Sequence, residues 1–334
     1  MFYIAEIGLN HNGKLSLAKE MVSAAQESGA DAVKFQSLQS EELIADSLNE
    51  PINGFGFKDV NNLRDFWYKV SIDRDFHLQI KQYCDEIGIE FMSTPFDENR
   101  VDLLDELEVE RFKIASGDLT HYPLIQTILQ KNKPIILSTG GSNLKEIHET
   151  VDFIKKQNFT KKLTLLHCVS LYPTPPAEAN LTMIDTLKQN FETQIGFSDH
   201  TRGFHITLAA IARGAEVIEK HFTIDNSLPG PDQQIAAEPD VFQKIVEYGK
   251  EVDTSLENRG PKLSPKEKSV QTEMRRSIVA AHPIEKGTKL KEEDLKYKRP
   301  ATGISPKYYK QVIGLEAQKQ IKTNEQINWE DIND

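Results

Sequence analysis

The chain is short of the features that mark several common classes of protein. Its 334 residues include only two cysteines, Cys84 and Cys168, and 40 Lys and Arg against 51 Asp and Glu. Two cysteines are too few for a disulfide framework, and their spacing matches no zinc motif. The net charge of −11 argues against nucleic-acid or anionic-membrane binding, which needs a basic face. A small anionic substrate is still compatible, because a few lysines can reverse the field inside a pocket.

Long hydrophobic runs are also missing. No stretch of about 18 apolar residues occurs, so we expect no membrane span. The first residues, MFYIAEIGLNHNG, have no basic segment, and Glu6 interrupts the only apolar run. We therefore expect no signal peptide and a cytoplasmic protein.

Short apolar runs alternate with segments of helical periodicity through the first 222 residues. The predicted strands cover 2–8, 31–37, 89–96, 111–116, 133–140, 163–169, 193–200 and 216–222. The predicted helices include 15–29, 75–87, 98–107, 122–131, 143–156 and 203–213. Eight strand–helix units in about 250 residues predict a parallel α/β fold of the (β/α)8 TIM-barrel type. A doubly wound open sheet is the alternative, but no Gly-rich dinucleotide loop follows the first strand.

A change of pattern divides the chain. Charge rises and periodicity fails around 251–276, so we predict a catalytic barrel, a linker and a small domain, at 1–254, 255–276 and 277–334. The small domain contains two similar segments, IEKGTKLKEEDL (284–295) and IKTNEQINWEDI (321–332). A turn, a short strand and a short acidic helix fit each copy, which predicts a compact, pseudo-symmetric domain. Chance similarity of the two segments is the alternative.

Polar side chains gather at the carboxyl end of almost every predicted strand, where TIM barrels build their active sites. They are Glu6, Lys34, Gln36, Ser93, Thr94, Lys113, Ser116, Ser138, His167, Ser198, His200, Glu219 and His221. One buried lysine can be an incidental ion-pair partner, but eight strands that all turn polar at the same end are hard to explain by packing. We therefore predict an active site at this end of the barrel.

Strand alternation brings two histidines together. Ser198 and His200 share one face of a strand, and Glu219 and His221 share one face of the next. Adjacent strands would place the two imidazoles side by side, where they could bind a divalent metal. Water or substrate would complete the coordination shell of this metal. Buried structural imidazoles are the alternative. Lys220 has the opposite parity, so we expect it to point toward the helices.

Two lysines and several hydroxyls predict an anion-binding rim. Lys34 and Lys113 would place two positive charges over the barrel mouth. The hydroxyl donors would be Ser93, Thr94, Ser116, Ser138 and Ser198. Lysine and hydroxyl groups together predict a compact anionic ligand that carries phosphate. The alternative is that each lysine pairs with Glu6 or Asp118 inside the barrel. Glu6, Asp118 and Glu219 are candidates for proton transfer or for stabilising positive charge, and the sequence does not rank them.

Nine motifs occur in an order that is similar to one enzyme family. They are IAEIGLNHNG, DAVKFQ, FMSTPFD, FKIASGDLTHYPLI, ILSTGG, LLHCVSLYPTP, IGFSDHTRGFHI, VIEKHFTID and PGPD. Together they resemble the sialic acid synthase family, which makes nonulosonic acids. The segment SIVAAHPIEKGTKLKEEDLKYKRP resembles that family's C-terminal antifreeze-like (SAF, β-clip) domain. The resemblance covers nearly the whole chain.

The resemblance implies a transferase reaction. Phosphoenolpyruvate would condense with the open-chain aldehyde of an N-acetylmannosamine-type sugar, to give N-acetylneuraminate or N,N'-diacetyllegionaminate. C3 of phosphoenolpyruvate attacks the aldehyde carbon, water adds at C2, and phosphate leaves with C–O cleavage. A divalent metal, Mn²⁺ with Mg²⁺ or Co²⁺ as alternatives, would polarise the aldehyde oxygen.

The same resemblance assigns roles to residues. His200 and His221 would bind the metal, and Glu6 and Asp118 occupy positions of acidic active-site residues. The contacts to phosphoenolpyruvate would be Lys34, Thr94, Lys113, Ser116, Ser138 and Ser198. The contacts to the sugar would be Asn53, Tyr172, Asp232 and Arg299. Arg299, in KRP, resembles the SAF-domain arginine that reaches the partner chain's active site, which implies a domain-swapped homodimer.

Several positions depart from the commoner family pattern. Asp118 stands in SGD where SGE is frequent, Gly141 ends STGG where STGM is commoner, and Gln233 replaces a histidine after PGPD. These departures concern sugar recognition more than the metal or phosphoenolpyruvate. The identity of the sugar and its phosphorylation at C6 therefore stay open. HTRGFHI and KRPATGIS are more similar to the legionaminate and neuraminate branches than to the pseudaminate branch.

Two other functions stay open. One is a Schiff-base aldolase that uses Lys113 or Lys34 on a barrel strand. The other is a sugar-binding paralogue without catalytic activity. The joint presence of both histidines, both lysines and Arg299 argues against this second alternative.

Overall fold

The computed structural model describes residues 1–45, 54–157, 159, 161–257 and 260–333. The chain forms two compact units, Met1–Glu257 and Asn258–Asp334, and each unit has its own hydrophobic core. The division falls inside the range 255–276 that we expected as a linker. This range also contains a helix, α11 (Pro265–Met274).

The first unit is a parallel β-barrel. Its strands are β1 (Phe2–Gly8), β2 (Ala32–Ser37), β3 (Glu90–Pro95), β4 (Phe112–Ile114), β5 (Ile135–Ser138), β6 (Leu163–Cys168), β7 (Gln194–Asp199) and β8 (Val217–His221). The strand order is β3-β2-β1-β8-β7-β6-β5-β4, with β1 hydrogen-bonded to both β2 and β8. Strands β3 and β4, at the two ends of this order, contact each other and close the ring. The predicted (β/α)8 barrel is confirmed, and the open-sheet alternative is excluded.

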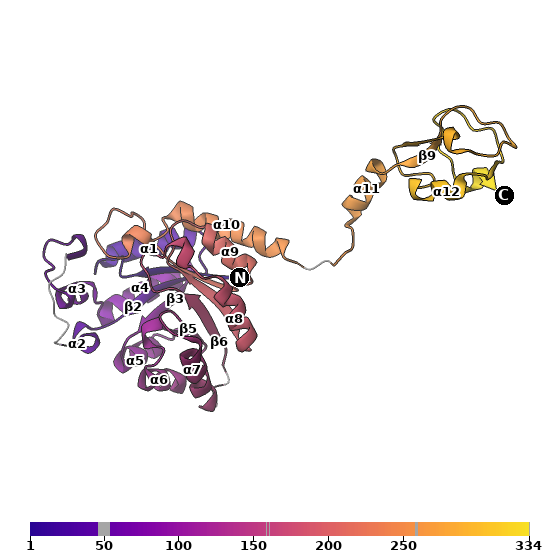
Figure 1. The fold of residues 1–334 in the computed structure, drawn as a ribbon. Helices are drawn as coiled ribbons and strands as arrows, with labels where there is room; N and C mark the ends of the chain where they lie inside the picture. The colour runs from indigo at the N-terminus through magenta and orange to yellow at the C-terminus, as the bar shows by residue number, and fades with distance from the viewer. Residues whose placement is uncertain (46–53, 158, 160, 258–259, 334) are drawn as a thin grey trace. The chain divides into compact units, whose positions relative to one another are not determined.

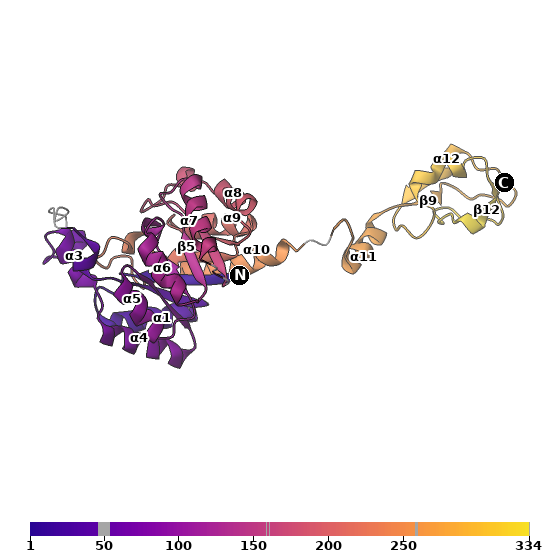
Figure 2. The same ribbon diagram turned by 90° about the horizontal axis from the view of Figure 1, so that it is seen from below.

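Helices surround the strands (Figure 1), and the view at right angles shows the same arrangement (Figure 2). They are α1 (Leu15–Glu27), α2 (Ser40–Leu43), α3 (Leu63–Val70), α4 (Arg74–Ile87), α5 (Glu98–Glu106), α6 (Tyr122–Gln130), α7 (Leu144–Lys156), α8 (Thr182–Asn190), α9 (His205–Ala212) and α10 (Pro239–Ser255). All six helices that we predicted are present. Helices α2, α3, α8 and α10 are additional. Of these, α3 and α8 each bury only two side chains, too few for a clear helical periodicity in the sequence.

Two layers of apolar side chains hold the barrel together. Outside the strands, α7 begins with an Asn143–Glu146 capping box and then buries Ile147, Val151 and Ile154 at helical spacing. Inside the strands, a smaller layer fills the lower part of the barrel. It consists of Ile4, Ala32, Met92, Ile136, Leu166 and Val217. The side chains at the carboxyl ends of the strands therefore rest on this apolar layer.

Gly196 on β7 is required for this close packing. An added Cβ would lie 2.4 Å from the carbonyl oxygen of Val217 and 2.5 Å from a methyl group of Leu166. Both distances are well inside van der Waals contact, so a side chain here would push the neighbouring strands apart. Because Ser198 follows two residues later on the same face, glycine at this position keeps the floor of the predicted site narrow.

The second unit is built from short elements. They are α11, β9 (Ser277–Ala280), β10 (Leu295–Lys298), α12 (Tyr309–Val312), β11 (Glu316–Ala317) and β12 (Ile332–Asn333). Strands β9 and β10 pair antiparallel, as do β11 and β12. Their buried side chains form a separate core that includes Ile278, Leu295 and Ile332.

The two repeated segments adopt matching structures. Gly287 and Asn324, at the same position of each copy, both have positive φ, of 85° and 65°. Gly and Asn are the residues that best tolerate this conformation. Ile284 and Ile321 also correspond, and the N–H of each donates to the carbonyl of the other at 2.9 Å. These reciprocal bonds relate the copies by approximate twofold symmetry, which supports a real repeat over chance similarity.

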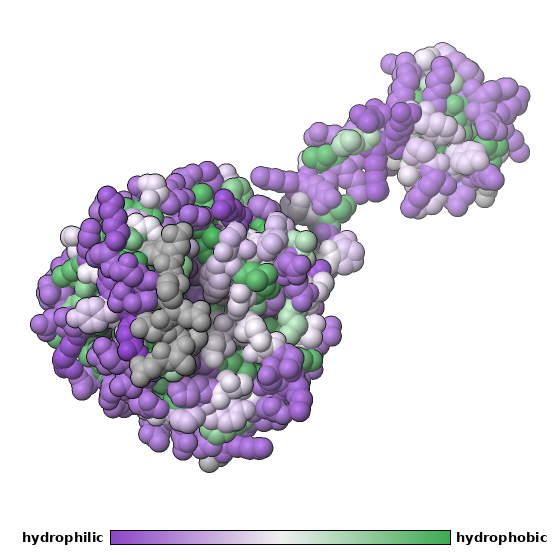
Figure 3. All heavy atoms as spheres, turned by 60° about the vertical axis from the view of Figure 1, so that its left-hand side comes forward, coloured by the Kyte–Doolittle hydropathy of each residue, from purple (hydrophilic) through white to green (hydrophobic). Residues whose placement is uncertain are grey.

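On the face shown in Figure 3, hydrophilic residues predominate and hydrophobic residues form small, separate areas. Among the described residues, no helix is both long enough and apolar enough to span a membrane.

Candidate active site

The barrel interior changes from apolar to polar toward the carboxyl ends of the strands. Glu6 follows Ile4 by two residues and Lys34 follows Ala32, so both continue the inward-facing side of their strands. The cavity above the apolar layer is lined by Glu6, Lys34, Gln36, Thr94, Phe96, Lys113, Ala115, Ser116, Ser138, Cys168, Tyr172, Ser198, His200, Glu219 and His221. All residues to which the family resemblance assigned a role are in this set except Asn53, Asp118, Asp232 and Arg299.

Four buried charges meet in this cavity. The Lys34 Nζ lies 2.7 Å from Oε2 of Glu6 and 3.6 Å from Oε2 of Glu219. The Lys113 Nζ lies 3.9 Å from Oε1 of Glu219. None of the four residues is more than 5% exposed. Two ammonium and two carboxylate groups cancel formally, which allows the cluster to stay buried. Lys34 therefore pairs with Glu6. This pairing was one of the alternatives that the sequence left open.

The two lysines differ in pKa. Burial disfavours both ammonium groups, but for Lys34 the carboxylates of Glu219 and Glu6 outweigh burial and raise the pKa. For Lys113 burial dominates, Lys34 adds repulsion, and the pKa is lowered. Burial alone would raise the pKa of Glu219, but Lys113 and Lys34 reverse this effect and lower it. The neighbouring charges therefore favour the charged forms of Lys34 and Glu219, whereas burial disfavours the charged form of Lys113.

Three of the predicted hydroxyls contact the charged cluster directly. The bonds run from Lys113 Nζ to Ser138 Oγ (2.7 Å), from Lys34 Nζ to Thr94 Oγ1 (3.2 Å) and from Ser198 Oγ to Glu219 Oε1 (2.8 Å). Lys113 Nζ also donates to the Ile114 carbonyl at 3.0 Å. Ser116 lies farther out, with its Oγ 3.4 Å from Ser170 Oγ. Ammonium and hydroxyl donors on one wall of a cavity are suited to a phosphate or carboxylate.

The two histidines lie side by side on neighbouring strands. His200 follows the end of β7 and His221 ends β8, with 5.4 Å between their ring centroids. The Nδ1 of His200 donates to the Val169 carbonyl at 2.8 Å, which leaves its Nε2 as the free nitrogen. The Tyr172 ring lies against His200, with 4.3 Å between the ring centroids. One face of the imidazole pair is therefore covered by an aromatic side chain.

The histidine pair suits a divalent metal. Burial, followed by repulsion from His221, lowers the pKa of His200 to about 4, so its ring is neutral at neutral pH, as metal binding requires. The buried Nδ1 of His221 has no hydrogen-bond partner. No group of three or more His, Cys, Asp or Glu ligands occurs among the described residues, so water or substrate oxygens would have to complete the shell. Mixed imidazole and oxygen ligands suit a borderline divalent ion.

Four residues to which the family resemblance assigned a role are outside the cavity lining. Asp232 lies close by, with its Oδ2 3.9 Å from the Nδ1 of His221. Asp118 ends the short 3₁₀ helix Ser116–Asp118, and burial raises its pKa. Asn53 lies outside the described residues. Arg299 is an exposed residue of the second unit.

Four lining residues had no predicted role: Gln36, Phe96, Ala115 and Cys168. Two of them, Gln36 and Cys168, make hydrogen bonds at the cavity. The Gln36 Nε2 donates to Glu6 Oε1 at 3.0 Å, and the Cys168 Sγ accepts from the Gly140 N–H at 3.1 Å. Alternation contained the signal for both residues, because each follows an inward-facing residue by two positions.

Strand alternation also corrects the assignment of two polar strand-end residues, Ser93 and His167, to the predicted active site. The Ser93 Oγ lies 2.6 Å from Ser37 Oγ, and the His167 Nε2 lies 2.9 Å from the Ala179 carbonyl. Neither residue lines the cavity, and both occupy the outward-facing parity of their strands. Including Ser93 among the hydroxyl donors of the rim was therefore wrong.

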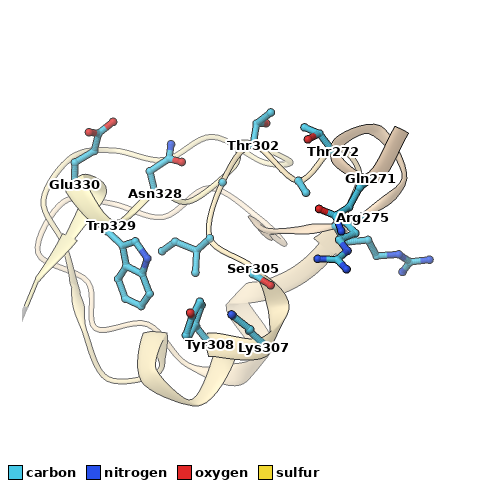
Figure 4. Close-up of a pocket in the computed structure, with 14 residues that line it drawn as sticks. Gln271, Thr272, Arg275, Thr302, Ser305, Lys307, Tyr308, Asn328, Trp329 and Glu330 are labelled. Carbon is cyan, nitrogen blue, oxygen red and sulfur yellow. The ribbon is translucent and has the colours of Figure 1, made fainter. Parts of the chain in front are cut away.

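A larger cavity, of about 640 Å³, lies in the second unit. Trp329 and Tyr308 line one side of it and Arg275 lies on the other (Figure 4), with 5.8 Å between the two aromatic centroids. None of the predicted site residues lines this cavity. Size alone therefore does not identify the site, and the buried charges and histidines of the barrel do.

Comparison with known families agrees with both units. The NeuB family model matches residues 21–260, and a SAF domain model matches residues 275–333. An N,N'-diacetyllegionaminic acid synthase from Campylobacter jejuni is 40% identical over 97% of this chain and 98% of that protein. A pseudaminic acid synthase from Helicobacter pylori is 33% identical over 98% of this chain and 97% of that protein.

A solved structure agrees with the barrel. It is the N-acetylneuraminic acid synthetase of Leptospira borgpetersenii serovar Hardjo-bovis, with a TM-score of 0.72 and 35% identity over 80% of this chain and 89% of that chain. The relatives are named as synthases of legionaminic, pseudaminic and sialic acids. This chain belongs to the NeuB family and carries a C-terminal SAF domain.

Proposed function

We propose that the protein condenses phosphoenolpyruvate with the open-chain form of an N-acetylated amino sugar and releases phosphate by C–O cleavage. The observation that carries the proposal is one cavity that contains two lysines, two glutamates and two adjacent histidines. N,N'-diacetyllegionaminate and N-acetylneuraminate are the preferred products. The preference rests on the motifs HTRGFHI and KRPATGIS and on the 40% identity to a legionaminic acid synthase.

The charges of the cavity support a phosphoenolpyruvate site next to a metal. Phosphoenolpyruvate brings both a phosphate and a carboxylate into a cluster whose own lysines and glutamates already cancel. Lys113, Lys34 and their hydroxyl partners would bind these groups, but the added negative charge needs further compensation. A divalent cation on His200 and His221 would provide it.

The protein's own residues account for orientation and charge. A cation held by His200 and His221, Mn²⁺ with Mg²⁺ or Co²⁺ as alternatives, would supply Lewis-acid polarisation of the aldehyde oxygen. The ionised Glu219, beside both lysines, suits stabilisation of positive charge that develops at C2 of phosphoenolpyruvate. Glu6 contacts Lys34 and Gln36, and it is our candidate for accepting a proton from the water that adds at C2. Tyr172 covers the histidines on the side where the sugar would enter.

The lowered pKa of Lys113 keeps one alternative reaction open. A buried amine with a lowered pKa is a suitable Schiff-base nucleophile. Sodium borohydride with pyruvate or the sugar would trap a Schiff base covalently on a lysine. We expect no trapping and complete inhibition by EDTA. Covalent trapping together with activity in EDTA would establish the aldolase instead.

The sugar end of the proposal includes Asn53, Asp232 and Arg299. By resemblance, Arg299 would act in the site of a partner chain within a domain-swapped homodimer, and the protein would be cytoplasmic. Subunit mixing tests the dimer. Arg299→Ala and His200→Ala are each expected to be inactive, and a mixture that exchanges subunits should regain part of the activity. No recovery after proven exchange would argue against an arginine that acts in trans.

Phosphate release tests the proposal as a whole. Phosphoenolpyruvate would be supplied with N-acetylmannosamine, its 6-phosphate, or 2,4-diacetamido-2,4,6-trideoxy-mannose or -altrose, with and without EDTA. We expect metal-dependent release with the free mannose-type sugars. No release with any of these sugars would refute the assignment.

A further inference from the structure

A second pair of buried charges lies on the outer face of the strands that carry the histidines. The Lys220 Nζ donates to Asp199 Oδ2 at 2.9 Å, and neither side chain is exposed. The two residues face each other across β7 and β8. Thr207 on α9 covers the pair and donates its Oγ1 to Asp199 Oδ2 at 2.5 Å. As expected from its parity, Lys220 points toward the helices and away from the cavity.

This pair holds the backbone of Thr201, the residue after His200. The Asp199 Oδ1 accepts the N–H of Thr201 at 2.8 Å, and the Lys220 Nζ donates to the Thr201 carbonyl at 2.6 Å. His200 lies between Asp199 and Thr201, one residue past the end of β7. Lys220 directly precedes His221 on β8. One ion pair thus connects the two chain segments that end in the two imidazoles.

Stability alone does not explain why this buried pair is charged. Removing two charges from water costs about as much as their attraction returns, so a buried ion pair is weak evidence for stability. An apolar pair would fill the space under α9 without that cost. An apolar pair would not, however, bind the N–H and the carbonyl of Thr201. The contacts that an apolar pair cannot make here are those that fix the turn of His200.

We infer that Asp199 and Lys220 are a positioning pair that sets the separation and direction of the His200 and His221 imidazoles for metal binding. The inference rests on the proposed function, because the metal belongs to that proposal. Neither residue of the pair lines the cavity. The effect of the pair passes through the backbone of residues 199–201 and of β8, as outer partners of metal ligands commonly act.

Binding of Mn²⁺ alone, measured by the electron paramagnetic resonance signal of the free ion, tests the inference without substrate. The main variant is Asp199→Leu with Lys220→Met, in which no charge is left unpaired. Thr207→Val removes only one bond to Asp199 and is the milder variant. Thermal unfolding of each variant is measured in parallel, to separate folding from metal affinity.

The matched control is an ion pair at the opposite end of the barrel. Arg111 donates two hydrogen bonds to the Glu90 carboxylate, at 2.7 and 2.9 Å, near the amino ends of β4 and β3. Arg111→Met with Glu90→Gln removes this pair and should leave Mn²⁺ affinity at the wild-type value. Any general effect of loosening the barrel would appear in this control.

We expect the Asp199→Leu, Lys220→Met protein to bind Mn²⁺ roughly 10- to 100-fold more weakly. The Thr207→Val protein should show a smaller loss in the same direction. Wild-type Mn²⁺ affinity in the folded variants would overturn the inference and leave the metal site intact, as would an equal loss in the Arg111 and Glu90 control. Failure of the unaltered protein to bind Mn²⁺ would overturn the metal site itself, and the inference with it.

Discussion

The inner and outer faces of the barrel wall both bury charges, but they treat them differently. On the outer face, the Asp199 carboxylate and the Lys220 ammonium make four hydrogen bonds among themselves and to neighbours under α9. On the inner face, the charged groups border a cavity, and the buried Nδ1 of His221 has no hydrogen-bond partner. The outer pair is satisfied by its own contacts, whereas the inner cluster keeps polar atoms available for a ligand.

The same strands build both faces, so the difference follows from alternation alone. Glu219 points inward and Lys220 points outward, although they are neighbours in the chain. Buried polar groups without partners are costly, and native structures tolerate them mainly where a ligand or water completes them. This contrast predicts that changes on the inner face mainly affect activity, whereas most changes on the outer face affect stability.

Loss of an inner histidine should have the largest effect. Changing His200 or His221 to Ala should abolish Mn²⁺ binding and lower turnover by at least about 10³-fold, because a metal supplies several kcal/mol of charge stabilisation. Phosphate release and thermal unfolding would both be measured. His148→Ala, on α7, is the control. An active variant without bound metal would remove the histidines from the mechanism.

Loss of an inner lysine should come next. Lys113→Met removes the donor to Ser138 from the anion-binding wall and should lower kcat/KM for phosphoenolpyruvate by about 10²- to 10³-fold. The control is Lys133→Met, near the amino end of β5, which should leave kcat/KM for phosphoenolpyruvate unchanged. A variant with normal kcat/KM would show that phosphoenolpyruvate binds elsewhere.

An outer histidine should affect stability instead, through pH. Burial lowers the pKa of His77 on α4 to about 4. Above pH 6.5 the ring is neutral in both the folded and unfolded chain. As the pH falls from 6.5 toward 4, only the unfolded chain gains the proton, so folding loses about 2 kcal/mol by pH 5.

Urea unfolding at pH 7 and pH 5 checks this prediction. The His77→Gln protein should lose less stability between the two pH values than the unaltered protein, while its phosphoenolpyruvate kinetics at pH 7 stay the same. Equal pH dependence in the two proteins would show that His77 is not the group responsible.

The smallest predicted effect belongs to a single outer hydrogen bond. The Thr150 Oγ1 on α7 donates to the Leu119 carbonyl at 2.9 Å. Thr150→Val should lower the free energy of unfolding by about 1 kcal/mol and leave kcat unchanged. Its inner counterpart is Ser198→Ala, which removes the bond to Glu219 and should lower kcat with little change in unfolding. A reversal of these two results would break the contrast between the faces.

Much of this site could be predicted from the sequence, because strand parity determines which side chains share a face. Parity placed His200 beside His221 and excluded Lys220 from the cavity. In the structure the two imidazoles are adjacent and Lys220 points toward the helices. Ser93 was assigned to the rim from its position at a strand end alone, and its parity excludes it. The pairing of Lys34 with Glu6 could not be chosen over Asp118, because it depends on the rotamers of long side chains in the assembled barrel.

Other features had too weak a local signal or depend on a second chain. Helix α11 lies in a highly charged segment and buries no side chain, so no apolar periodicity indicates it. The roles of Asn53 and Arg299 stay predictions. A role that is completed in a partner chain depends on contacts that a single chain does not contain.

Isotope transfer from phosphoenolpyruvate tests the central claim most directly. Phosphoenolpyruvate labelled with ¹⁸O in the oxygen that bridges C2 and phosphorus would be turned over with the preferred sugar and Mn²⁺, and the released phosphate analysed by mass. C–O cleavage predicts that the label leaves in the phosphate. Unlabelled phosphate, with the label retained in the sugar acid, would contradict the reaction proposed for this cavity.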